Sequence, residues 1–302
     1  MGMLRPHLFI LAEECRERYP ITGDVLVLGQ QAVYSTLDEI SRLLAKKGLK
    51  MRSLPAGFDT ANKIPAWKDS PCGMYTNCQT VFKLLGADNV YVADISGHEG
   101  ADILMDLNSP CDKKYHNRFD TIFDVGTLEH VFNLPQALDN IHKCCKPGGQ
   151  IVLINPATNA INHGFYQISP TLYHDFFDAN GYEDFSCYLT QISSFNYEAK
   201  SKIYKFRESN ISDVVMLTSK NIEEIVFFCR KKRDYQNSET KTPIQRVYQN
   251  IFSGKITSEK RNKLQAFVDY LFFLTRRWRP EIIDRFRLRL FLKKRLLYIG
   301  RY

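Results

Sequence analysis

The sequence predicts an α/β fold with an open, mostly parallel sheet, helices on both faces of the sheet, and a helical C-terminal appendage. Two observations lead to this prediction. Over the first 190 residues, short runs rich in Val, Ile and Leu alternate with segments of helical periodicity, which is typical of parallel strands buried on both faces. After Lys232 the alternation stops, and a polar segment precedes residues with helical spacing. We therefore expect a domain over 1–232 and a basic, helical appendage over 233–302.

Each expected element has a local signal. The first 20 residues have an apolar patch followed at once by acids, which favours a helix over a signal peptide. A Thr-x-x-Glu start and a Gly stop delimit the next helix. Residues 50–74 are rich in Pro, Gly and small polar residues and are expected to form a loop. The predicted strands are 24–29, 89–96, 101–107, 119–126 and 150–156, with two later ones in DFSCYLTQI and IEEIVFFCRKK; the helices are 36–49, one ending at Gly86, 134–149 and 169–182.

Charge and cysteine content exclude several classes of protein. The net charge of +8 resides in residues 276–302, which contain ten Lys or Arg against two acids, so the rest of the chain is neutral. Nucleic-acid binding would place positive charge along a cleft, so a nucleic-acid partner is not expected. The eight cysteines include no Cys-x-x-Cys pair. Reduced thiols in a cytoplasmic protein without a metal site are the expectation.

The basic tail admits two interpretations. Pro280 can open a helix, with Ile283, Phe286, Leu290 and Leu297 on one face and with Trp278 and Tyr298 near its ends. Such a helix can lie peripherally on the anionic inner face of a membrane. Alternatively, its apolar face packs against the protein's own body or against a second subunit in a homodimer, because the apolar arc is wide.

Small and acidic residues occupy the ends of the predicted strands. Gly29 ends the first strand, Asp94 the second and Asp106 the third, and the fourth ends at Asp124 to Thr127. Ligands bind at the carboxyl ends of strands in open α/β sheets, where a carboxylate can accept two hydrogen bonds from ribose hydroxyls. These four strand ends therefore predict a nucleoside-binding edge.

Several segments carry a family resemblance. The segment FDTIFDVGTLEHVFNLPQALDNIHKCCKPGGQIVLINP, together with VYVADIS, ILMDLN and HGFYQISPTLYHDFFDANGY, resembles the class I S-adenosylmethionine-dependent methyltransferases over roughly residues 20–232. The resemblance implies a Rossmann-like sheet, S-adenosyl-L-methionine as cofactor, and an acceptor of the small-molecule or glycan type. It implies cofactor contacts at Gly29, Gln30, Asp94, Ile95, Asp106, Leu107, Asp124, Val125 and Gly126.

Three residues are candidates for catalysis. Glu129 and His130 follow the fourth strand, beside the expected position of the transferred methyl group, and His163 lies on the loop after the fifth strand. A histidine can act as a general base at neutral pH; alternatively, Glu129 and His130 only order their loop. Tyr166 and Gln167 are candidates for substrate contact because such loops face the active cleft.

The predicted function is methyl transfer to an oxygen of a small molecule or glycan. Two alternatives stay open: an RNA or other nucleic-acid methyltransferase, suggested by the tail, and a non-catalytic binding protein of the same fold. The second arises because the first loop, LGQQAVY, has a single glycine where the family usually has several.

Overall fold

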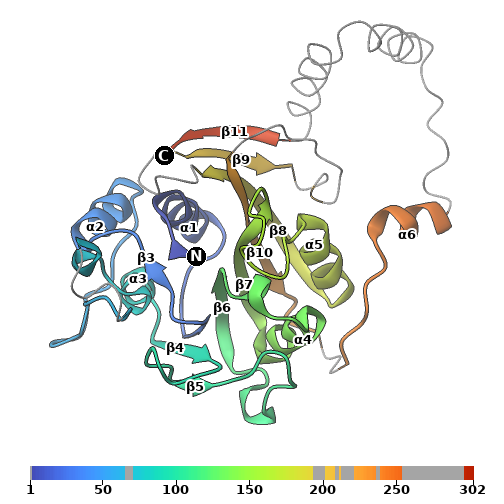
Figure 1. Cartoon of the computed structure of the whole chain (residues 1–302), viewed down its shortest axis with the longest axis horizontal. Coiled ribbons are helices and arrows are strands. Elements are labelled where there is room, and N and C mark those ends of the chain that lie inside the picture. The colour runs from blue at the N-terminus through green and yellow to red at the C-terminus, as the bar shows by residue number, and fades with distance from the viewer. Residues whose placement is uncertain are drawn as a thin grey trace, which may run out of the picture.

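The computed structural model describes residues 2–64, 71–192, 201–207, 211, 221–235, 239–253 and 296–302. Within these residues, one nine-stranded sheet with the order β11-β9-β8-β10-β7-β6-β2-β4-β5 forms the centre of the molecule (Figure 1). Its strands are β2 (Asp24–Leu28), β4 (Asn89–Asp94), β5 (Ile103–Leu104), β6 (Phe119–Val125), β7 (Cys145–Thr158), β8 (Tyr182–Ile192), β9 (Lys202–Phe206), β10 (Ile222–Lys231) and β11 (Leu296–Arg301). A separate two-stranded sheet pairs β1 (Gly2–Met3) with β3 (Ala32–Val33).

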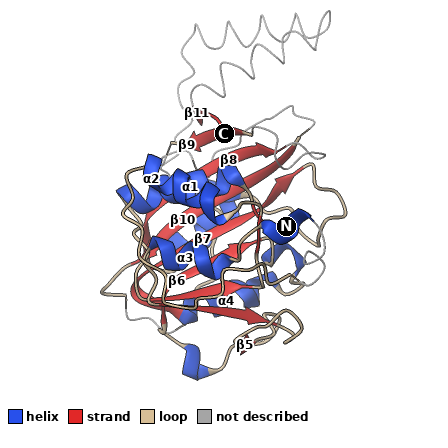
Figure 2. Ribbon diagram, turned by 90° about the vertical axis from the view of Figure 1, so that its left-hand side faces the viewer, coloured by secondary structure: helices blue, strands red, loops and turns tan. Residues whose placement is uncertain are grey.

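The helices are placed as the α/β pattern predicts. The α-helices are α1 (Arg5–Glu17), α2 (Leu37–Lys46), α3 (Cys78–Leu85), α4 (Leu134–Cys144), α5 (Pro170–Ala179) and α6 (Arg246–Phe252), and the 3-10 turns are η2 (Pro71–Met74), η3 (Lys113–Tyr115) and η4 (Leu128–His130). Helices α1, α2 and α3 lie on one face of the sheet (Figure 2). Helices α4 and α5 pack on the other face.

The core divides into two apolar layers, one on each face of the sheet. Leu26 and Leu28 of β2 point into the layer under α4 and α5, whereas Val25 and Val27 point into the layer under α1 to α3. Successive side chains of a strand point to opposite faces, so the continuous apolar run of β2 is explained by burial on both sides. The predicted Rossmann-like α/β fold is therefore confirmed.

The sheet is half parallel and half antiparallel, rather than mostly parallel as the sequence predicts. Strands β5, β4, β2, β6 and β7 run parallel, whereas β10, β8, β9 and β11 are joined by antiparallel pairings. The chain passes from β2 to β4 and β5 on one side and then crosses to β6 on the other. The strand order therefore reverses beside β2, and the carboxyl ends of β2, β4 and β6 form the edge where such sheets bind ligands.

Local signals explain most element boundaries, with one correction. Thr36 accepts a hydrogen bond from the Glu39 amide, and the Glu39 carboxylate accepts one from the Thr36 amide, which confirms the expected capping box of α2. The predicted helix over 134–149 is too long, because α4 ends at Cys144 and β7 begins at Cys145. Pro147 disfavours helical geometry in the residue before it, so the Lys-Pro-Gly-Gly segment starts the strand rather than closing the helix.

The last residues of the chain join the sheet. Residues Leu296–Arg301 form β11 and pair with β9, and Ser201 and Tyr302 exchange backbone hydrogen bonds of 2.7 and 2.9 Å. The expectation that Leu297 and Tyr298 are helical is therefore wrong. Strand β9 offers an edge of unpaired backbone groups, and β11 satisfies them.

The structure describes only part of the remaining appendage, residues 233–295. Residues Arg246–Phe252 form α6, as the helical spacing after the polar segment predicts. Residues 254–295, with most of the predicted basic helix, lie outside the described residues. The boundary at 232/233 stays a prediction, although β11 belongs to the same sheet as β2. None of the described helices has the length and apolarity needed to cross a membrane. The seven cysteines whose side chains the structure describes are free thiols.

Candidate active site

Three predicted strand ends converge at the carboxyl edge of the sheet. Gly29 has a φ of +69°, a conformation that disfavours residues with a Cβ. A Cβ at this position would lie 2.8 Å from Thr127 Oγ1 and 3.8 Å from Asp94 Oδ2. The ends of β2, β4 and β6 are therefore in close approach, and a glycine is required where they meet.

Glutamines, rather than further glycines, shape the rest of this loop. Gln31 is buried, and its amide donates to the Leu28 carbonyl and, at 3.2 Å, to Thr127 Oγ1. Gln30 forms long side-chain hydrogen bonds of 3.3 and 3.5 Å with Gln79 at the start of α3. The loop is thus held by side-chain bonds to its neighbours. The cofactor contact of Gln30 stays a prediction.

The two acidic strand ends differ in their surroundings. Asp94 Oδ1 accepts from the Ser96 amide at 2.9 Å, while Oδ2 is the oxygen near Gly29. Asp106 is exposed, and its Oδ1 accepts from the backbone and side-chain nitrogens of Asn108. These bonds hold the pKa of Asp106 below its ordinary value. Asp106 therefore forms a local turn, whereas Asp94 faces the glycine of the first loop.

The remaining predicted cofactor residues fall into two groups. Ile95 is 70% exposed beside Asp94, and Gly126 is partly exposed at the end of β6. Leu107 and Val125 are buried in the core, so only their backbone atoms are available to a ligand. The family resemblance could not separate the exposed from the buried residues. Successive residues at a strand end point alternately into the core and toward the cleft, and the resemblance does not say which do which.

Asp124 belongs to a buried polar network and not to the cleft surface. Its Oδ2 accepts from Asn155 Nδ2 at 2.6 Å, and the same nitrogen donates to Glu129 Oε2 at 2.9 Å. Tyr173 donates to Asn155 Oδ1 at 2.6 Å. Burial, with the nearby charge of Glu129, raises the pKa of Asp124 to about 7. Asn155 and Tyr173 are not among the site residues predicted from the sequence. The only sequence signal for this network is that Asn155 is a polar residue at the end of the fifth predicted strand.

The three predicted catalytic residues lie together. Glu129 is buried on η4, and its Oε1 is 3.5 Å from His163 Nε2 and 3.9 Å from His130 Nε2. The two imidazole rings meet edge to face, with 5.0 Å between centroids. Both histidines are partly exposed. Residues 33 positions apart in the sequence thus form one cluster at the surface of the cleft.

Gly164 makes this cluster possible. A Cβ on Gly164 would lie 2.7 Å from the Glu129 carbonyl oxygen and 3.0 Å from Glu129 Cγ. The Tyr166 amide donates to the same carbonyl at 3.2 Å. The loop that carries His163 therefore packs directly on the backbone of η4. Sequence reasoning missed Gly164, although a glycine directly after His163 was a signal of close approach.

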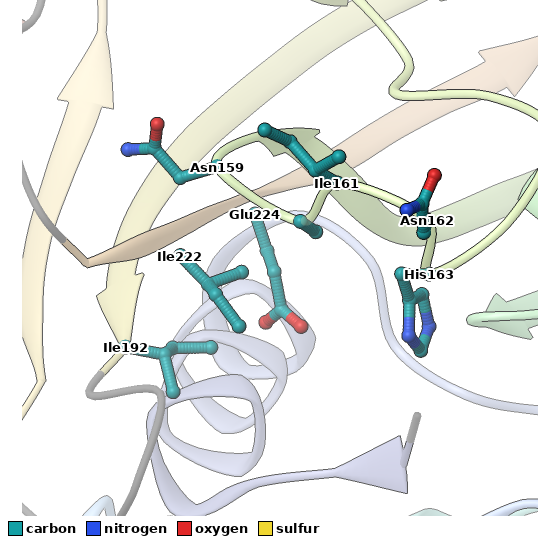
Figure 3. A pocket seen from close by; sticks show the side chains of 8 residues that line it. Asn159, Ile161, Asn162, His163, Ile192, Ile222 and Glu224 are labelled. Carbon is teal, nitrogen blue, oxygen red and sulfur yellow. The ribbon is translucent and has the colours of Figure 1, made fainter.

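A cavity of about 270 Å³ adjoins the cluster (Figure 3). It lies between the loop after β7 and the facing ends of β8 and β10. Glu224, at its base, is buried and lies 2.7 Å from His7 Nε2. Its lining residues are Asn159, Ala160, Ile161, Asn162, His163, Ile192, Ile222 and Glu224. The cavity therefore combines an apolar side with a few polar groups, as small-molecule pockets do.

Tyr166 and Gln167 both order the loop beside this cavity. The Tyr166 hydroxyl donates to the Phe132 carbonyl at 2.7 Å, and Gln167 Oε1 accepts from the Ala160 amide at 3.1 Å. Their predicted contact with substrate stays a prediction. Phe132 and Phe165 are exposed and meet edge to face at 5.6 Å, which adds an aromatic surface to this part of the cleft.

One family model matches part of the chain. Residues 38–185 match a family model described as a methyltransferase domain. A comparison with curated proteins gives no match.

Solved methyltransferase structures match this chain at low identity and low TM-score. The citrinin polyketide synthase CMeT domain is 11% identical at a TM-score of 0.40 over 75% of this chain, which spans 52% of that one. A Haemonchus contortus phosphoethanolamine N-methyltransferase in complex with S-adenosylhomocysteine is 10% identical at 0.35, over 74% of this chain and 52% of that one. These values carry no argument about substrate. The match over residues 38–185 identifies a methyltransferase domain in this chain.

Proposed function

We propose that this protein transfers a methyl group to an oxygen of a small molecule or of a single glycan unit. The observation that carries the proposal is the cluster of Glu129, His130 and His163 beside a cavity of about 270 Å³. Such a cluster can take the proton of a hydroxyl group, and the cavity volume lies just below the range of about 300–1,000 Å³ that is usual for ligand pockets.

The cofactor end of the site fits S-adenosylmethionine. The space at Gly29 that a Cβ would fill lies next to Asp94 and Thr127. Asp94 would hold the ribose hydroxyls, Gly29 would allow backbone to approach the methionine portion, and Ile95 would cover the adenine. When bound, the cofactor supplies a methyl group on a sulfonium, an electrophile that needs an acceptor with a free electron pair.

The acceptor end supports an oxygen nucleophile. A hydroxyl group is a weak nucleophile until its proton is removed. Burial lowers the pKa of His163, so its imidazole is neutral at neutral pH and can accept that proton. Glu129, fixed by Asn155 and Gly164, then lies beside the imidazole that gains the charge. An acceptor bound in the cavity lined by His163 and Glu224 would present its hydroxyl at this cluster.

The test combines cofactor binding with transfer of a labelled methyl group. Calorimetry should show S-adenosylhomocysteine binding at micromolar affinity, about −8 kcal/mol. Labelled S-adenosylmethionine should then methylate a compound in the small-molecule or glycan fraction of a cell extract, and the label should resist mild base as an ether does. His163→Ala should abolish the labelling and keep cofactor affinity. Label found on RNA, or no cofactor binding at millimolar concentration, would refute the proposal.

A further inference from the structure

The Glu129, His130 and His163 cluster has the composition of a metal site. One carboxylate oxygen and two imidazole nitrogens, from residues on η4 and on the loop after β7, all lie within 4.8 Å of one another. Two imidazoles and one carboxylate are the protein ligands of many catalytic zinc and non-haem iron sites. The sequence alone does not indicate a metal site here, because His163 is far along the chain from Glu129 and His130.

Two of the three ligand atoms lack a hydrogen-bond partner among the described residues. Glu129 Oε1 and His163 Nε2 are buried and make no hydrogen bond among the described residues. A buried carboxylate oxygen without a donor is destabilising by about 1–3 kcal/mol or more. The distance of 3.5 Å between these atoms exceeds that of a normal hydrogen bond. A direct contact therefore does not account for the arrangement.

The separations fit a cation between the donors. Two ligand atoms each about 2.1 Å from a metal, at a tetrahedral angle, lie roughly 3.4 Å apart. Glu129 Oε1 is 3.5 Å from His163 Nε2 and 3.9 Å from His130 Nε2. The two imidazole nitrogens lie within 4.8 Å of each other, so a cation could bind all three donors after side-chain adjustments of up to about 1.4 Å.

The surroundings hold the donors in place. Asn155 donates to Glu129 Oε2 and leaves Oε1 to face the two histidines, and Tyr173 in turn fixes Asn155. Outer partners of this kind orient metal ligands. The amides of His130 and His163 bond to the carbonyls of Thr127 and Ala160 at 3.0 and 3.1 Å.

We propose that Glu129, His130 and His163 bind one divalent transition-metal cation of the zinc type, which holds the acceptor oxygen. Imidazole favours Zn²⁺, Co²⁺ or Fe²⁺ over Mg²⁺ and Ca²⁺. Three protein ligands leave a coordination position open, and the two histidines are 44% and 33% exposed at the cleft. With the cation bound, His163 is a ligand and no longer accepts the proton, and a hydroxyl group bound to the cation would lose its proton to solvent more readily. The catalytic role rests on the proposed function, whereas cation binding does not.

The experiment measures binding directly. The full chain is treated with a chelator, dialysed, and titrated with Co²⁺ by optical spectroscopy and with Zn²⁺ by calorimetry. We expect one cation per chain and a Co²⁺ spectrum of nitrogen and oxygen ligands, without sulfur charge-transfer bands. His163→Ala, His130→Ala and Glu129→Gln should each weaken binding by about tenfold or more. His98→Ala, an exposed histidine outside the cluster, should change it by less than about twofold.

Each failure has a distinct meaning. Equal affinity in wild type and in all three ligand variants, sulfur charge-transfer bands, or no binding below millimolar cation would overturn the metal site. Full methyl transfer by the chelator-treated protein would overturn the role of the cation while the proposed function stands. Cation binding without S-adenosylhomocysteine binding would leave the site intact and refute the proposed function.

Discussion

Gly164→Ala is the sharpest test of how the cluster is built. The substitution adds one methyl group where the loop after β7 packs on η4. Its Cβ would lie 2.7 Å from the Glu129 carbonyl oxygen and 3.1 Å from the Glu129 carbonyl carbon. Both are backbone atoms, so no side chain can rotate away. The loop itself must shift, and His163 moves with it.

The size of the shift follows from these distances. Ordinary contact begins near 3.4 Å, so the loop must withdraw by about 0.7 Å. The separation between His163 Nε2 and Glu129 Oε1, now 3.5 Å, would grow to roughly 4 Å. Misplacement of about 1 Å can reduce a rate on the order of 10²-fold. We therefore expect turnover to fall about 10- to 100-fold, with a loss of about 1–3 kcal/mol in the free energy of unfolding.

The assay compares turnover with cofactor affinity. The affinity for S-adenosylhomocysteine should stay within about twofold of wild type, because Gly29 and Asp94 are on other strand ends. Gly48→Ala is the control, since a Cβ there meets nothing within 4 Å but its φ of +71° strains the backbone. It should destabilise by about 1–2 kcal/mol without affecting turnover. Unchanged turnover in Gly164→Ala would show that the contact between the two loops does not position the catalytic residues.

Three further predictions concern the cofactor edge, the core and the C-terminal strand. Asp94→Ala should weaken S-adenosylhomocysteine binding by about 1.5–3 kcal/mol in calorimetry, whereas Asp106→Ala, whose carboxylate is used in an exposed turn, should change it by less than about threefold; equal losses would show that the two acids have the same role. Burial lowers the pKa of His142 from 6.5 to about 4, so between these pH values the unfolded chain binds a proton that the folded chain does not bind. The free energy of unfolding should therefore fall by about 3 kcal/mol as the pH drops from 6.5 to 4. If urea titrations of His142→Phe show the same dependence of this free energy on pH as wild type, the prediction is wrong. Leu296→Ala, buried in β11, should lower the free energy of unfolding by about 2–4 kcal/mol, and Leu297→Ala, 42% exposed, by less than about 1 kcal/mol; similar thermal shifts for the two would argue against the strand.

The sequence by itself determined the fold class and the edge of the sheet that carries the site. Hydrophobic runs such as β2 are local signals, because a strand buried on both faces needs apolar residues at every position. The capping box of α2 and the strand-end residues Gly29 and Asp94 are local as well. Position along a parallel strand fixes the edge at which each of these residues lies, so the convergence at Gly29 could be predicted.

Only the tertiary structure decided which of these residues face the cleft and which polar side chains from distant parts of the chain lie together. The burial of Asp124 and Leu107 depends on which face of the sheet α4 and α5 cover. The course of the final strand depends on the free edge of β9, which no local pattern encodes. The cluster of Glu129, His130 and His163 forms because Gly164 lets one loop pack on another. Contacts between residues distant in the chain are set by the packing of whole elements, and a single sequence shows only the local preferences of each element.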